Sequence, residues 1–228
     1  MRINRIITLA LLSLLITVNG YCEGADLKSL WDEYGALMKA GDTSKAALVL
    51  QSIGKKQINA NKYDDAEKAY AQALKLLGEK APERTLANIW LEVATLHRKM
   101  AQPEIALIEL RHAQNIGGVS VKLYLEHART LTALKRLKEA KGYYLSAFKA
   151  IKKRYGKSHR AIARLLAEIS ALYARAGRLK RAKQLVKRGL MVNRRLKDQK
   201  VKGYENRQKK MLAKLTAALT SRNDTVSS

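Results

Sequence analysis

The side chains of this chain with the clearest capacity for chemistry are its cations. The 228 residues include 45 Lys and Arg against 19 Asp and Glu, which gives a formal net charge of +26. Residues 135–220 hold 27 of the cations against 4 acidic residues, whereas residues 25–134 hold 15 against 13. A field of one sign attracts anions and releases counterions when they bind. We therefore expect the C-terminal half to contact an anionic partner.

The cations are densest close to the C-terminus, where they would follow one helix and its exit. A face that serves only solubility usually mixes charges of both signs, and this one does not. Acidic proteins, lipid head groups, anionic glycans and nucleic acids are the anions that such a run could bind. The candidate residues of this anion-binding surface are Arg178, Lys180, Arg181, Lys183, Lys187, Arg188, Arg194 and Arg195.

Signatures of catalysis and of metal binding are missing from the sequence. The sequences IGKK at 53–56 and LGEK at 77–80 lack the rest of a phosphate-binding loop, and no GxSxG nucleophile motif occurs. The histidines are His97, His112, His127 and His159, and they stand apart from any ligand-like cluster. His97 and His127 fall at apolar packing positions, which predicts partly buried histidines there. We therefore expect no enzyme, no cofactor, no metal and no small-molecule substrate.

Residues 1–24 have the pattern of a secretory signal peptide. Arg2 and Arg5 form a positive start, and the apolar stretch at 6–18 is shorter than the roughly 20 residues that span a membrane. The alternatives are an uncleaved anchor and a lipid-modified Cys22. We expect an exported protein, first of all in the periplasm, with secretion or membrane association as further options. Export argues against nucleic acid as the partner.

The cations named above lie within a repeated sequence pattern, which must position them in the fold. Alanines recur at the same place in four similar phrases, separated by 40, 34 and 42 residues: Ala66, Ala106, Ala140 and Ala182. Seven residues after each stands another small residue. Self-similarity at such a period is typical of stacked helical hairpins, which usually serve as binding scaffolds.

The apolar pattern and the turn residues predict ten helices after the leader. The first and the last of them should cap the two ends of the stack, and the polar residues 221–228 should form a disordered tail. The predicted spans are 26–40, 43–59, 63–78, 84–100, 103–117, 120–133, 137–153, 159–175, 179–195 and 201–220.

The unit resembles the tetratricopeptide repeat, a helix–turn–helix of 34 residues. Counted from Ala87, residues of the family's types fall at its positions, namely Trp90, Val93, Ala94, His97, Ala106, Leu110 and Ala113, and the same register holds from Ala47, Val121 and Ala163. The longer intervals, with Gly156 and His159, resemble the repeats of kinesin light chain. The resemblance implies an all-α, right-handed superhelical solenoid. Its domain would cover residues 25–220, with repeats near 47–80, 87–120, 121–154 and 163–196.

The resemblance also implies where a partner would bind. Members of the family usually hold peptides in a concave groove lined by the first helix of each hairpin. Glu126 and Glu168 stand where the carboxylate clamp of chaperone-binding members needs cations, which argues against that clamp. The groove residues that could favour an acidic peptide are Arg98, Lys99, Lys122, Leu125, Arg129, Arg164 and Arg175.

These features together predict a non-enzymatic adaptor that binds another protein, expected to be acidic, while its basic half docks on an acidic partner or on the anionic surface of the cell envelope. Two alternatives stay open at this point. One is a polyanion-binding protein in which the repeats only carry charge, and the other is an accessory subunit of an envelope assembly or secretion machine.

Overall fold

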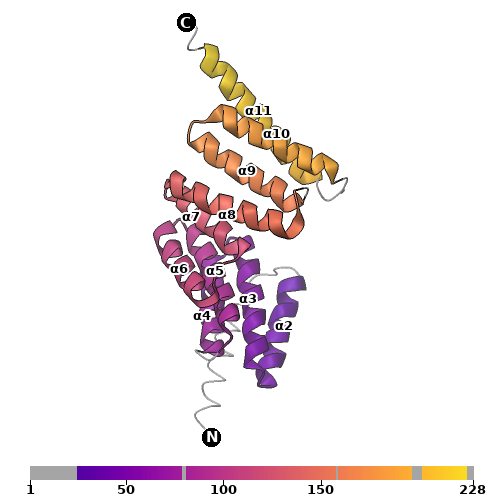
Figure 1. The fold of residues 1–228 in the computed structure, drawn as a ribbon. Helices are drawn as coiled ribbons and strands as arrows, with labels where there is room; N and C mark the ends of the chain where they lie inside the picture. The colour runs from indigo at the N-terminus through magenta and orange to yellow at the C-terminus, as the bar shows by residue number, and fades with distance from the viewer. Residues whose placement is uncertain (1–24, 79–80, 158, 197–201, 225–228) are drawn as a thin grey trace. The chain divides into compact units, whose positions relative to one another are not determined.

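The computed structural model describes residues 25–78, 81–157, 159–196 and 202–224. These residues form ten α-helices and no strand, so the all-α prediction is confirmed (Figure 1). Among the described helices, none has the length and the apolar character needed to cross a bilayer. The predicted signal peptide at residues 1–24 lies outside the described residues. Contacts divide the chain into two compact units, one up to Ala81 and one from Pro82 onward.

The N-terminal unit consists of a helical hairpin and one further helix packed against it. Gly54 allows the close approach within the hairpin, because a Cβ at this position would lie 2.8 Å from the ring of Tyr70. A hydrogen bond of 2.6 Å from the Gln72 amide to the Tyr34 hydroxyl ties the further helix to the hairpin. The helices are α2 (Ala25–Lys39), α3 (Thr43–Asn59) and α4 (Tyr63–Leu77).

The C-terminal unit consists of three hairpins and a terminal helix. Each hairpin packs on the next, and the terminal helix packs on the last hairpin. The observed bounds follow the predicted spans closely: α5 (Glu83–Lys99), α6 (Pro103–Gly117), α7 (Val121–Ala133), α8 (Leu137–Tyr155), α9 (Arg160–Arg175), α10 (Leu179–Arg195) and α11 (Lys202–Asp224). We call α5, α7 and α9 the first helices, and α6, α8 and α10 the second helices of their hairpins.

Small residues mark the places where the two helices of a hairpin meet. Ala106, Ala140 and Ala182 are fully buried, as their recurrence in the sequence predicts. In the last hairpin the facing small residue is Ser170, whose hydroxyl donates a hydrogen bond of 2.7 Å to the carbonyl of Ala182. Side chains of this size let two helix backbones approach closely, which is why the alanines recur.

The turns inside the hairpins use the left-handed backbone conformation. Gly177 takes this conformation in the last hairpin, with φ of 71°. Ala101 and Lys135 take it in the other two, with φ of 60° and 59°, although a side chain makes it less favourable. The three turns are therefore similar in geometry even though their sequences differ.

A buried amide joins the terminal helix α11 to the last hairpin. The Gln208 side chain is only 2% exposed. It donates to the carbonyl of Ala163 at 3.0 Å and accepts from the Asn193 amide at 2.7 Å. Gly189 makes room for it, because a Cβ there would lie 2.6 Å from the Gln208 amide nitrogen. The helix α11 thus closes the end of the stack, as its capping role in the sequence predicts.

The end of α11 differs from the prediction. The helix continues to Asp224, so residues 221–224 are helical and the expected boundary at residue 220 lies four residues too early. Hydroxyl groups of Thr216, Thr220 and Ser221 donate to backbone carbonyls of the preceding turn, which satisfies these polar side chains within a helix. Residues 225–228 of the predicted tail lie outside the described residues.

Candidate functional site

The first helices of the C-terminal unit carry a row of glutamates. Glu92 on α5, Glu126 on α7 and Glu168 on α9 occupy the same place, the sixth, in three successive repeats. Glu92 and Glu126 are 5% and 4% exposed. Carboxylates are rarely buried to this degree unless they are paired, because a charge loses its hydration inside a protein. Glu92 and Glu126 must therefore have partners that compensate their charge. We call the surface that this row forms on α5, α7 and α9 the first-helix face.

Cations from neighbouring helices pair with this row. Lys122 at the start of α7 reaches back to Glu92 on α5. Arg98 near the end of α5 donates its Nε–H to Oε2 of Glu126 on α7, at 3.0 Å. Both pairs join helices of successive hairpins, so they link one repeat to the next.

Arg129 on α7 connects two of the carboxylates. Its Nε and Nη2 groups donate to the two oxygens of Glu168 on α9, at 2.9 and 2.6 Å, in the bidentate geometry that suits a guanidinium. It also pairs with Glu126 on its own helix. Burial lowers the pKa of Arg129, but its hydrogen bonds to Glu168 and the charges of both glutamates outweigh this effect and raise the pKa above its ordinary value. Burial, with the nearby charge of Glu168, raises the pKa of the Tyr144 hydroxyl to about 12.

The structure thus brings together three of the predicted groove cations and balances them with three carboxylates. Of the other predicted groove residues, Leu125 is half-buried against the hydrophobic core, and Lys99, Arg164 and Arg175 are exposed. The burial of Glu92 and Glu126 was not predicted. The recurrence of glutamate at one repeat position was the available signal for it.

The cations of α10 have a different setting, and we call their surface the α10 face. Three pairs recur at a spacing of seven residues, which is two helical turns or about 10 Å along the axis. No ion pair joins a cation of α10 to an acidic residue in the part of the chain that the structure describes. All predicted members of this surface are exposed except the half-buried Lys183: Arg178, Lys180, Arg181, Lys187, Arg188, Arg194 and Arg195.

Two of the histidines, His97 and His127, take part in packing contacts. His97 on α5 pairs with Glu109 on α6 at 2.7 Å, and both side chains are largely buried. His127 is 1% exposed, stacks on the ring of Tyr143 and has no hydrogen-bond partner on either ring nitrogen among the described residues. Burial, with the nearby charge of Arg111, lowers the pKa of His127 to about 4. No cluster of potential metal ligands occurs in the described residues.

Comparison with known proteins identifies a repeat family over part of the chain. Residues 120–194, which include α7 to α9 and all but the last residue of α10, match the tetratricopeptide repeat. None of the curated proteins is significantly similar to this chain in sequence.

Several solved structures share the fold. BtubC (BKLC) from P. vanneervenii has 15% sequence identity and a TM-score of 0.66, over 87% of this chain and 90% of that one. The pilF protein of Pseudomonas aeruginosa has 17% identity and a TM-score of 0.54, over 67% of this chain and 64% of that one. MamA from residue 41 onward, from Desulfovibrio magneticus RS-1, has 13% identity and a TM-score of 0.53, over 77% and 99%. At such identities the similarity concerns the fold alone.

Proposed function

Residues 120–194 belong to the tetratricopeptide repeat family, and from this premise we propose that the chain is an exported, non-enzymatic adaptor that binds another protein. Proteins built from such repeats serve as scaffolds for protein–protein interaction because stacked hairpins present a long, continuous surface. The observation that carries the proposal is the first-helix face, where ion pairs between successive hairpins hold α5, α7 and α9 to one another. A surface fixed in this way loses little conformational entropy when a partner binds.

The second part of the proposal concerns the basic half. Apart from the half-buried Lys183, the cations of α10 are exposed, and they lack acidic partners among the described residues, so an acidic protein or the anionic envelope surface would find them available. This observation also favours a second candidate function, a polyanion-binding protein. The two functions differ in selectivity, because a charge field alone binds many anions and its binding is lost as salt is raised.

Affinity capture from an envelope extract tests the adaptor role. Residues 25–228, which include every described residue, are immobilised, and bound material is compared at low and at raised salt. We expect one protein in a fixed ratio that survives the salt. A mixture of anionic material lost with salt would contradict the adaptor role and support polyanion binding.

Two variants with the same change of charge locate the contact. One carries Lys99→Glu and Arg175→Glu on the first helices, and the other carries Lys187→Glu and Arg194→Glu on α10. All four side chains are exposed, so neither variant removes a buried group. Loss of the captured protein only in the first variant would place it on the first-helix face. Arg129→Glu is unsuitable here, because it would put a third carboxylate beside Glu126 and Glu168.

A further inference from the structure

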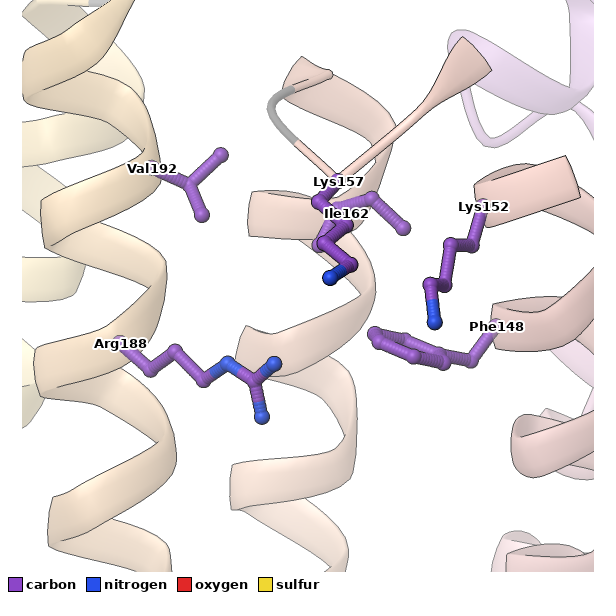
Figure 2. Close-up of a pocket in the computed structure, with 6 residues that line it drawn as sticks. All are labelled: Phe148, Lys152, Lys157, Ile162, Arg188 and Val192. Atoms are coloured by element: carbon purple, nitrogen blue, oxygen red, sulfur yellow. The ribbon is translucent and has the colours of Figure 1, made fainter. Parts of the chain in front are cut away.

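A hollow between the last two hairpins is separate from the first-helix face. It has a volume of about 200 Å³, is open to solvent, and is formed by α8, α10, the start of α9 and Lys157 in the connection between α8 and α9 (Figure 2). Its lining residues are Phe148, Lys152, Lys157, Ile162, Arg188 and Val192.

The walls of the hollow are apolar. Ile162 and Val192 are 2% and 9% exposed and belong to the hydrophobic core, and Phe148 packs against that core from α8. An apolar cavity of about 150 Å³ is large enough to take up benzene, whereas pockets for whole small molecules measure about 300–1,000 Å³. The hollow therefore has room for one large apolar side chain and is too small for a lipid acyl chain or a drug-sized ligand.

Cations surround the opening of the hollow. Figure 2 shows the charged groups of Lys152, Lys157 and Arg188 extending from three separate segments toward the space between them. All three are exposed, and none takes part in an ion pair with the acidic residues that the structure describes. Three cations that converge without a counter-charge favour a bound anion, and more so beside an apolar wall that excludes water.

We propose that this hollow binds an acidic segment of a partner protein, with one large apolar side chain of the segment in the hollow and flanking carboxylates on Lys152, Lys157 and Arg188. The inference rests on the proposed role in protein binding and names the chemistry of the partner. Apolar anchors in small pockets, surrounded by charges that select the partner, are a common way for protein interfaces to gain both affinity and specificity.

Two short fluorescein-labelled peptides test the inference without the natural partner. One has the sequence Glu-Glu-Phe-Glu-Glu and the other has Ala in place of Phe, and binding to the protein is followed by fluorescence anisotropy at about 0.15 M salt. We expect the Phe peptide to bind about tenfold more tightly, because its ring is removed from water in the hollow. Equal binding of the two peptides would overturn the proposal.

Variants of the hollow separate the anchor from the charge. Val192→Phe fills the hollow from inside without changing the charge, and it should abolish the preference for Phe while binding of the Ala peptide stays the same. The triple change of Lys152, Lys157 and Arg188 to Ala should weaken both peptides by about tenfold or more. The matched control changes Lys138, Lys141 and Lys210 to Ala, three exposed residues that belong neither to the hollow nor to the α10 face, and removes the same charge, so it should have a much smaller effect.

The remaining outcomes are also decisive. A preference for Phe that persists in Val192→Phe, or equal losses in the two triple variants, would overturn the hollow as a site. A third outcome is that vesicles of phosphatidylcholine with about a quarter phosphatidylglycerol displace the peptides, and that the Phe and Ala peptides bind equally. This outcome would assign the cations to a lipid surface instead. A clear preference for Phe together with only salt-sensitive capture would contradict the adaptor role and leave the hollow standing. Salt-resistant capture of one protein without any preference for the Phe peptide would contradict the hollow as a site and leave the adaptor role standing.

Discussion

The first-helix face and the α10 face carry similar numbers of cations but use them in opposite ways. On α5, α7 and α9, three cations pair with three glutamates that lie close to the core. On α10, cations recur every seven residues, and no described carboxylate pairs with them. Net charge alone does not distinguish these two settings. The comparison indicates that the charges of the first helices hold the repeats together, whereas those of α10 remain available to bind.

Glu126→Gln should have the largest effect on stability. The change removes the charge that pairs with both Arg98 and Arg129, two guanidinium groups held beside a buried position. We expect the free energy of unfolding to fall by about 2–3 kcal/mol, because breaking a buried ion pair leaves a charge without compensation. Urea unfolding followed by circular dichroism measures the loss.

Glu139→Gln is the matched control for this prediction. It removes the carboxylate of an exposed ion pair with Arg136 on α8, at 2.6 Å. Exposed pairs contribute about 0–1 kcal/mol, so the change should be small. Equal losses in the two variants would show that burial of Glu126 does not matter and would remove the basis of the comparison.

Gln208→Leu should come next in size. The substitution leaves the Asn193 amide and the Ala163 carbonyl without their buried partner. The expected loss is about 1–3 kcal/mol, the usual penalty for an unsatisfied buried polar group. Lys210→Leu, at an exposed position of the same helix, is the control. An unchanged unfolding curve for Gln208→Leu would mean that α11 is not held by this amide, so that the support of α10 must come from elsewhere.

A pH dependence should arise from His127 beneath the first-helix face. Its pKa of about 4 in the folded chain lies below the ordinary 6.5, because burial disfavours the charged ring. As the pH falls, the unfolded chain therefore takes up the proton before the folded chain does. The contribution of neutral His127 to the free energy of unfolding is fully present above pH 6.5 and is lost as the pH drops from 6.5 to 4. With solvent screening, the loss should be roughly 1–2 kcal/mol.

The difference between the wild type and His127→Phe isolates this contribution from other titrating groups. Thermal unfolding at several pH values should show a steeper decline between pH 6.5 and 4 in the wild type. The exposed ring of His112 provides the control, because His112→Gln should follow the wild type. Parallel curves for the wild type and His127→Phe would contradict the effect of burial on the pKa.

The double change of Lys187 and Arg188 to Gln should have the smallest effect on stability. Neither residue has an ion-pair partner among those described, and like charges repel one another along α10. We expect the free energy of unfolding to change by no more than about 0.5 kcal/mol, in the direction of a gain, because the substitution relieves this repulsion. The salt concentration that elutes the protein from a heparin column should fall clearly. A marked loss of stability would show that the α10 face has a structural role after all.

The fold could be predicted from the sequence because each hairpin repeats a local pattern. Small residues mark the helix crossings, as at Ala106, Ala140 and Ala182, and turn residues separate the helices. Such signals act over a few residues, and stacking then follows from the need to bury one face of every hairpin. The C-terminal end was placed less well, because Thr, Ser and Asn residues fit the end of a helix and a tail equally.

The candidate site could be predicted only in part. The predicted groove cations Arg98 and Arg129 lie on first helices, and their role in binding stays a prediction. Their ion pairs were not predicted, because the partners lie 28 and 39 residues away along the chain. Gln208 illustrates the same limit. Its sequence surroundings are polar and basic, and nothing local indicates that its amide would be buried against Ala163. The hollow likewise needs side chains from three segments at once.

The recurrence of glutamate at one repeat position bears on how this array could change length during evolution. If residues 121–154 were lost, Glu168 would follow α5 in the place that Glu126 occupies now, and Arg98 would meet an equivalent carboxylate. Glu92 would lose Lys122, but Arg164 holds the same repeat position on α9 and could replace it. A duplicated hairpin would likewise bring its own glutamate and its own cation. Duplication or loss of the hairpin formed by α7 and α8 therefore leaves no orphaned charge on the first helices. The last hairpin could not be exchanged in this way, because its contacts with Gln208 occur only once. Gain or loss of a hairpin is therefore confined to the interior of the array.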